Sequence, residues 1–292
     1  MKSFSEYNPS VTALWFLSVA LFSMFCKRPE TALISYLSAI SFFTVKNRGE
    51  SIKTHVFFAV FIAVLSLANP IFNHRGETVL FVANDNPITL EALIYGINSA
   101  FSIAGTLCWF RCFSQIMTSD RLMHITGRLS PKLSLVFSMC VRFLPLMKRQ
   151  SEKIKDTQKT LGIYGDGTFA EKVAGNMRVF SSLATWSLEN SIVTADSMTA
   201  RGYGISRRTH YTDFSMTLSD RLLLAVTALL SALCTASAVN KGFEVQFYPS
   251  FSTGRYGFFT VLGNASFAVL SFIPLIAEIW SEIKWKLLLS EI

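Results

Sequence analysis

The sequence predicts an all-α fold, a polytopic membrane helix bundle of about six spans with two long cytoplasmic helices. Of the 292 residues, 51% are hydrophobic and only 16% are charged, whereas a soluble domain carries about a quarter charged residues. The apolar residues form long blocks without Asp, Glu, Lys or Arg, and the basic residues concentrate in one central block. These three observations exclude an intrinsically disordered chain and a single soluble domain.

Six uncharged stretches are the expected spans, because a helix needs about 20 apolar residues to cross a bilayer. They cover residues 7–26, 31–45, 56–73, 92–110, 222–240 and 256–277. The stretch 31–45 has only 15 residues. It is therefore a span with little tilt, a span that thins the bilayer locally, or a re-entrant segment.

The central basic block predicts the topology. Residues 111–221 contain 16 Lys or Arg against 9 Asp or Glu, and loops that stay in the cytoplasm are enriched in Lys and Arg. Placing this block inside puts both termini inside and assigns 22 of the 27 basic residues to the cytoplasmic side. We therefore expect a multi-pass protein of the cell membrane with cytoplasmic N- and C-termini. This topology also explains the net charge of +8, so the lipid bilayer, and no nucleic acid, is the expected partner of the charged residues.

The chain is expected to have three parts: residues 1–110 with spans one to four, 111–217 in the cytoplasm, and 218–292 with spans five and six. Two long amphipathic helices are predicted in the middle part, over residues 131–162 and about 169–201, each followed or ended by a glycine suited to a left-handed cap. At about 1.5 Å per residue each helix extends roughly 45 Å. Amphipathic helices of that length need a surface to cover.

The motifs of several enzyme classes are absent. The chain has no nucleotide-binding P-loop, no His-Glu-x-x-His and no Gly-x-Ser-x-Gly sequence, and its five cysteines lack the spacing of a metal site. The expected spans contain almost no ionisable groups, which argues against a carrier driven by its own proton or ion coupling. We therefore predict no catalytic residue, no metal site and no bound cofactor. The phenylalanines of two spans are expected to contact lipid or a partner: Phe57, Phe58, Phe61, Phe267 and Phe272.

The two long helices end in similar sequences. Residues 156–162 read Asp-Thr-Gln-Lys-Thr-Leu-Gly, and residues 196–202 read Asp-Ser-Met-Thr-Ala-Arg-Gly. Ordinary C-capping explains a glycine and a nearby cation at such a position. The recurrence at the ends of two long cytoplasmic helices indicates a further role for these residues.

Together with these ends, four segments resemble the transmembrane T component (EcfT/CbiQ-like) of energy-coupling factor (ECF) transporters, which take up vitamins or metal ions in prokaryotes. The segments are residues 69–81, 86–92, 142–146 and 200–204, the last followed by Arg207-Arg208-Thr209. The resemblance implies a non-catalytic coupling subunit of an ABC-type importer. It also implies two ATP-binding-cassette (ABC) ATPase partners, which use ATP and Mg, and a small membrane-embedded S component that binds the substrate.

The resemblance implies that each long helix docks through its end into one ATPase subunit. The residues concerned are Ala200, Arg201 and Gly202 on the second helix and Thr160, Leu161 and Gly162 on the first, with Lys159, Arg207 and Arg208 as supporting contacts. At the first end, Leu161 stands where the family pattern has arginine. Either Lys159 supplies a cation from nearby or the partner ATPase presents an apolar groove. The difference between the two ends suggests two non-identical ATPases.

Two other classes of protein compete with this interpretation: an integral-membrane lipid-modifying enzyme and a stand-alone carrier. An enzyme of that kind would need clustered carboxylates or histidines at the cytosolic interface. Glu152 and Asp156 form one helical pair flanked by lysines, which is the pattern of ordinary helix salt bridges. An ATPase that binds this chain would separate the first interpretation from both alternatives.

Overall fold

The computed structural model describes residues 4–47, 51–73, 76–83, 86–164, 167–205, 216–248, 252 and 257–290. The chain forms two compact units. One, called the bundle here, comprises Met1–Thr118 with Phe214–Ile292, and the other, called the helix-pair unit, comprises Ser119–Asp213. The three-part division at residues 110 and 217, into membrane and cytoplasmic segments, stays a prediction.

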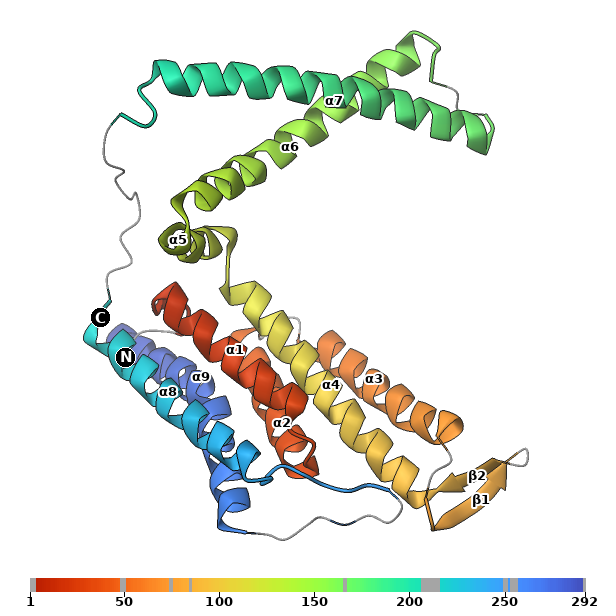
Figure 1. Cartoon of the computed structure of the whole chain (residues 1–292), viewed down its shortest axis with the longest axis vertical. Helices are drawn as coiled ribbons and strands as arrows, with labels where there is room; N and C mark the ends of the chain where they lie inside the picture. The colour runs from red at the N-terminus through yellow and green to blue at the C-terminus, as the bar shows by residue number, and fades with distance from the viewer. Residues whose placement is uncertain are drawn as a thin grey trace. The chain divides into compact units, whose positions relative to one another are not determined.

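The described part of the bundle contains six long helices (Figure 1). They are α1 (Pro9–Phe25), α2 (Pro29–Lys46), α3 (Ser51–Phe72), α4 (Leu90–Ile116), α8 (Leu218–Val239) and α9 (Phe258–Ser290), preceded by a 3-10 turn at Phe4–Glu6. A short antiparallel hairpin, β1 (Val79–Ala83) with β2 (Asn86–Thr89), connects α3 to α4. The prediction of an all-α membrane bundle is confirmed, and most of each of the six uncharged stretches lies in one helix.

Among the described residues, four helices are long and apolar enough to cross a membrane: α3, α4, α8 and α9. Helix α1 is apolar but has 17 residues, and α2 has 18 residues with a more polar composition. The polar residues of α2 are buried between neighbouring helices: Ser35 Oγ lies 2.7 Å from Ser23 Oγ and accepts a hydrogen bond from Trp109 Nε1 at 3.2 Å. Buried polar side chains of α2 are thus hydrogen-bonded to neighbouring helices, which explains why this helix is less apolar than a span that faces lipid.

An aromatic cluster joins the N-terminal turn to α1, α2 and α4. The ring centroids of Phe4 and Trp15 lie 5.2 Å apart, and those of Trp15 and Trp109 lie 5.3 Å apart, in edge-to-face arrangements. Such aromatic pairs stabilise the fold by more than the burial of their apolar surface alone. The expectation for the phenylalanine-rich spans was wrong at two positions: Phe58 and Phe267 are buried inside the bundle. Apolar periodicity did not show which side of a fully apolar helix faces its neighbours.

Some of the hydrogen bonds between distant parts of the bundle mark its two ends. One end carries Phe4 N to Glu278 Oε2 at 3.1 Å, Asn8 N to Asp220 Oδ1 at 3.0 Å and Asn47 Nδ2 to Gln115 Oε1 at 3.0 Å. The other, the hairpin end, carries Asn73 Nδ2 to Tyr248 Oη at 3.0 Å and Asn98 Nδ2 to Lys27 O at 2.9 Å. The helices therefore alternate in direction, as a six-span topology requires. Which end faces the cytoplasm stays a prediction.

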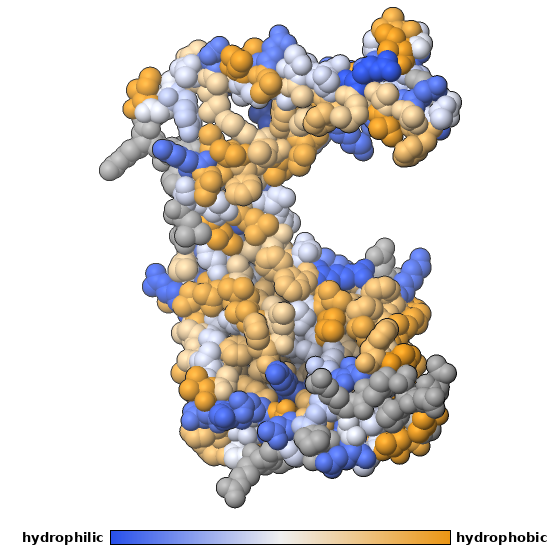
Figure 2. All heavy atoms as spheres, turned by 45° about the vertical axis from the view of Figure 1, so that its right-hand side comes forward, coloured by the Kyte–Doolittle hydropathy of each residue, from blue (hydrophilic) through white to orange (hydrophobic). Residues whose placement is uncertain are grey.

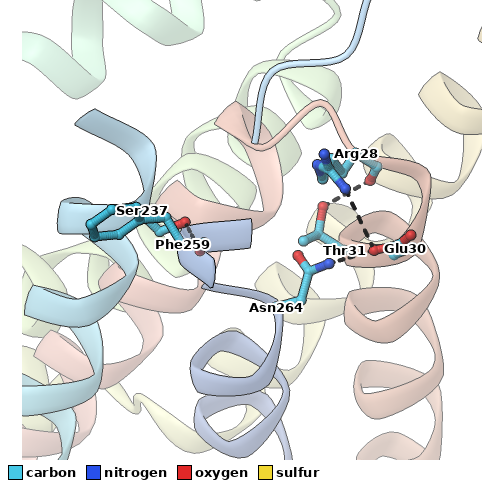
Figure 3. Close-up of polar contacts among 6 residues, drawn as sticks. All are labelled: Arg28, Glu30, Thr31, Ser237, Phe259 and Asn264. Carbon is cyan, nitrogen blue, oxygen red and sulfur yellow. Dashed lines mark hydrogen bonds and ion pairs between the residues drawn. The ribbon is translucent and has the colours of Figure 1, made fainter. Parts of the chain in front are cut away.

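Polar contacts also link the helix beginnings at the hairpin end (Figure 3). The side chain of Arg28 is 2% exposed, and its Nη1 lies 3.9 Å from Glu30 Oε2. The hydroxyl of Thr31 donates a hydrogen bond to the backbone carbonyl of Arg28 at 2.8 Å. Asn264 of α9 donates to the same Glu30 carboxylate. These contacts position the start of α2 against α9.

We expect Asp220→Ala to destabilise the bundle by about 2–3 kcal/mol, because it removes charge-assisted hydrogen bonds from a buried carboxylate. Asp220 accepts from Asn8 N, from Thr217 N at 2.9 Å and from Thr217 Oγ1 at 2.7 Å, and it closes the capping box of α8. The midpoint of thermal unfolding in detergent measures the effect. The control is Glu244→Ala, which breaks an exposed ion pair of 3.7 Å with Lys241 and should change stability little. Equal midpoints for the two variants would contradict the prediction.

The helix-pair unit contains α5 (Ser119–Leu129), α6 (Pro131–Thr160) and α7 (Phe169–Ala200). The bounds of α6 and α7 agree with the predicted helices to within two residues, and Pro145 lies inside α6. Helix α7 begins with a capping box, in which Thr168 N donates to Glu171 Oε2 at 3.1 Å. The short helix α5, not predicted, packs on the start of α6, where Ser134 Oγ donates to Met123 O at 3.2 Å.

Candidate docking site at the ends of α6 and α7

The two predicted site segments adopt the same backbone structure, a Schellman cap. At the end of α6, Gly162 N donates to Lys159 O at 2.9 Å and Ile163 N to Gln158 O at 3.0 Å. At the end of α7, Gly202 N donates to Thr199 O at 2.9 Å and Tyr203 N to Met198 O at 3.0 Å. Both glycines have positive φ, 69° and 80°, which other residues adopt only with strain.

The first tip, defined as Thr160–Ile163, presents an apolar surface. Leu161 occupies the last position before the capping glycine and is 65% exposed, and Ile163 follows at 47%. The chain then turns back, so that Tyr164 is buried against α7. The predicted residues of this end therefore lie next to two exposed hydrophobic side chains, those of Leu161 and Ile163.

The second tip, defined as Ala200–Ile205, presents a cation with apolar neighbours. Arg201 occupies the position equivalent to Leu161, is exposed and has no ion pair within the described part of the chain. Tyr203 and Ile205 are also exposed. Such a guanidinium can form paired hydrogen bonds with a carboxylate or backbone carbonyls of another protein.

Of the three predicted supporting residues, Lys159 lies within the described part of the chain. The Lys159 ammonium lies 5.7 Å from the centre of the Tyr164 ring, so it faces its own chain rather than the outermost surface of the tip. Arg207 and Arg208 lie outside the described residues. Sequence reasoning missed Tyr164, because only its contacts with Gly175 and Asn176 of α7 distinguish it from other residues of the loop.

Helices α6 and α7 cross within their unit (Figure 1). At the crossing the rings of Phe143 and Trp186 stack, with centroids 5.8 Å apart and planes 7° from parallel. Both helices still carry exposed apolar residues, and apolar atoms are visible on the surface of this unit in Figure 2. These residues are Leu133, Val136, Phe137 and Leu144 on α6, and Met177, Phe180, Leu188 and Ile192 on α7.

Metal-ligating side chains do not gather in the part of the chain that the structure describes. No group of three or more His, Cys, Asp or Glu side chains there could hold a metal ion. The thiols of Cys108 and Cys112, one helical turn apart, are buried within α4.

Similar proteins are named as transporter components. The Energy-coupling factor transporter transmembrane protein EcfT of Streptococcus equi subsp. equi (strain 4047) is 30% identical over 101 residues, which cover 34% of this chain and 38% of that protein. The protein of the same name from Listeria innocua serovar 6a (strain ATCC BAA-680 / CLIP 11262) is 28% identical over 121 residues, 41% of this chain and 44% of that protein. The chain thus spans about two fifths of the length of the curated relatives it matches.

A family model covers more of the chain than these relatives do. The model described as CbiQ, cobalt transport protein, matches residues 2–211. This match includes the helices α1 to α7 and both tips. Since it extends over well more than half of the 292 residues, the chain belongs to the CbiQ family of cobalt transport proteins.

Proposed function

We propose that this chain is the transmembrane component of an ECF-type ABC importer that takes up a vitamin or a metal ion. In this role it links ATP hydrolysis by two ATPase subunits to substrate release from a membrane-embedded S component. The chain itself is not catalytic, and ATP and Mg are bound by the ATPases. Family membership and the printed names of the relatives support the assignment. The lipid-modifying enzyme and the stand-alone carrier have no comparable support.

The observation that carries the proposal is the matched pair of tips. Two helices of 30 and 32 residues end in the same Schellman cap, and each holds one side chain, Leu161 or Arg201, exposed before the glycine. A cap of this kind ends the helix at a defined residue, so the exposed side chain lies at the very end of a long helix. A partner that binds this side chain can therefore move the whole helix when the partner itself moves.

The two tips should bind different grooves. Leu161 and Ile163 offer apolar surface, which a hydrophobic groove would cover. Arg201 offers a guanidinium, which acidic side chains or backbone carbonyls would bind. We therefore propose that the two ATPases are non-identical.

The exposed apolar residues of α6 and α7 supply the surface for the S component. These helices are too hydrophobic on their exposed sides for a unit surrounded by water. Side chains such as Phe137 and Leu188 would be covered by a small membrane-embedded subunit. When ATP drives closure of the two ATPases and moves α6 and α7, the S component in contact with these helices would move with them.

Co-purification tests this function. Tagged protein would be isolated in detergent from cells that also express candidate ABC ATPase subunits, and the retained ATPase would be quantified. We expect Arg201→Glu and Leu161→Glu each to reduce retention at least about tenfold, because charge reversal or burial of an unpaired charge in a docking contact costs about 2–5 kcal/mol. Lys148→Glu, an exposed charge reversal on α6 away from the tip, is the control. If the wild-type protein folds but retains no ATPase, the proposed function is wrong.

A further inference from the structure

We propose that Tyr164 is a positioning residue that holds the first tip in its docking conformation before the ATPase binds. The inference rests on the proposed function and extends it to residues outside the docking segments. It arises from a set of contacts, called the Tyr164 clasp, between the chain just after α6 and the first turns of α7. The clasp comprises Tyr164 with Lys155 and Lys159 of α6 and Gly175, Asn176 and Arg178 of α7.

The Tyr164 ring fits against a glycine of α7. A Cβ atom built on Gly175 would come within 2.8 Å of Tyr164 Cδ2, so only glycine permits this approach. The hydroxyl at the other end of the ring donates a hydrogen bond to Asn176 Oδ1 at 2.8 Å. One face of α7 therefore receives the whole side chain, which is only 9% exposed.

Cations from both helices complete the clasp. The ammonium groups of Lys155 and Lys159 lie 5.2 Å and 5.7 Å from the centre of the Tyr164 ring, within the range of cation–π attraction. From α7, Arg178 Nη1 donates to Ile163 O at 2.9 Å. The backbone on the far side of the capping glycine is thus bound to α7 by its own carbonyl and by the next side chain.

The first tip is consequently fixed on both sides. The Schellman cap ties the backbone to α6, and the clasp ties it to α7, with Leu161 and Ile163 exposed between them. At the second tip, the backbone hydrogen bonds of residues 201–205 run to α7 itself or within the tip, as in Ile205 N to Gly202 O at 3.2 Å. The described residues contain no clasp equivalent at that end.

The clasp, present only at the first tip among the described residues, compensates for the absence of an arginine there. A leucine cannot form the charge-assisted hydrogen bonds available to Arg201, so its contact with an ATPase is weaker per residue. A surface that is already ordered loses less conformational entropy when it binds. The clasp also assigns Lys159 to the Tyr164 ring, which favours the apolar groove over a substitute cation as the partner of the first tip.

Spin labels on the full-length protein in nanodiscs test the pre-ordering without any partner. Exposed Cys140 is first replaced by serine, and a nitroxide is attached after Ile163→Cys or, as the matched control, Ile205→Cys. We expect a less mobile spectrum at 163 than at 205. Tyr164→Ala should mobilise the label at 163 and leave the label at 205 unchanged. Identical spectra at 163 with and without Tyr164 would overturn the inference.

ATPase retention tests the consequence for docking. In the Arg201→Glu background, where binding depends on the first tip, Tyr164→Ala should lower ATPase retention about tenfold and Tyr164→Phe by less, because the ring remains. Lys148→Ala, at an exposed position of α6 away from both tips, is the control in the same background. If Leu161→Glu abolishes retention but Tyr164→Ala does not alter it, the positioning role fails while the proposed function stands. If the wild type retains no ATPase, the proposed function itself fails.

Discussion

Replacing Trp15 with phenylalanine is expected to destabilise the bundle by about 1–3 kcal/mol through one orphaned carbonyl group. The indole Nε1 of Trp15 donates to Leu270 O at 3.2 Å, and both residues are fully buried. Leu270 O would normally accept from the amide four residues later, but that residue is Pro274, which has no N–H. Phenylalanine keeps most of the ring contacts and removes only the donor.

The proline makes a double-mutant test possible. In a Pro274→Ala background, the alanine amide can bond Leu270 O along the helix, so Trp15→Phe should cost about 1–2 kcal/mol less than in the native chain. Thermal unfolding midpoints in detergent would measure both values. Trp280→Phe, at an exposed position of the same helix, is the control. Equal costs in the two backgrounds would show that the indole does not serve the carbonyl freed by the proline.

Replacing Gly96 with valine is expected to separate α3 from α4 and to destabilise the bundle by about 1–3 kcal/mol or more. A Cβ atom on Gly96 would lie 2.7 Å from Ser66 O and 3.0 Å from Asn69 Cβ. Ser66 O lies four residues before Pro70, so it too lacks its usual amide partner within the helix. Backbone cannot move aside as a flexible side chain can, so the helices themselves must shift.

The close approach at Gly96 also supports a hydrogen bond nearby. Asn69 Nδ2 donates to Ala92 O at 2.7 Å, one turn along α4. Gly96→Val should therefore lower the unfolding midpoint and raise protease accessibility around α3. Ile97→Phe, which adds volume on the exposed side of α4, is the matched control and should have little effect. An unchanged midpoint for Gly96→Val would contradict the close approach of α3 and α4 at this glycine.

The helices of this protein were largely predictable because their signals are local. Uncharged apolar length marks the bundle helices, and the capping glycines Gly162 and Gly202 mark where α6 and α7 end. The candidate tips were predicted for the same reason, since each is a short stretch next to a helix end. The extension of α9 to Ser290 was not predicted, because charged residues after Ala277 end the apolar stretch but not the helix.

Packing partners far apart in the sequence were not predictable in this way. Phe57 and Phe58 are adjacent and chemically identical, yet one is 57% exposed and the other 2%. The choice depends on which neighbouring helix lies against α3, and no local pattern carries that information. The same holds for Trp15, whose donor serves a carbonyl 255 residues away.

By itself, the sequence determined that this is a membrane protein with two long helices ending in matched glycine caps, because apolar length, periodicity and backbone freedom depend on neighbours in the chain. Only the tertiary structure decided that the first tip is held by Tyr164 against Gly175 while the described second tip is not. It also decided that the carbonyl of Leu270, which has no amide partner because residue 274 is proline, accepts a hydrogen bond from Trp15. These features require two surfaces to meet, and their physical cause is the close packing of distant side chains against exposed backbone.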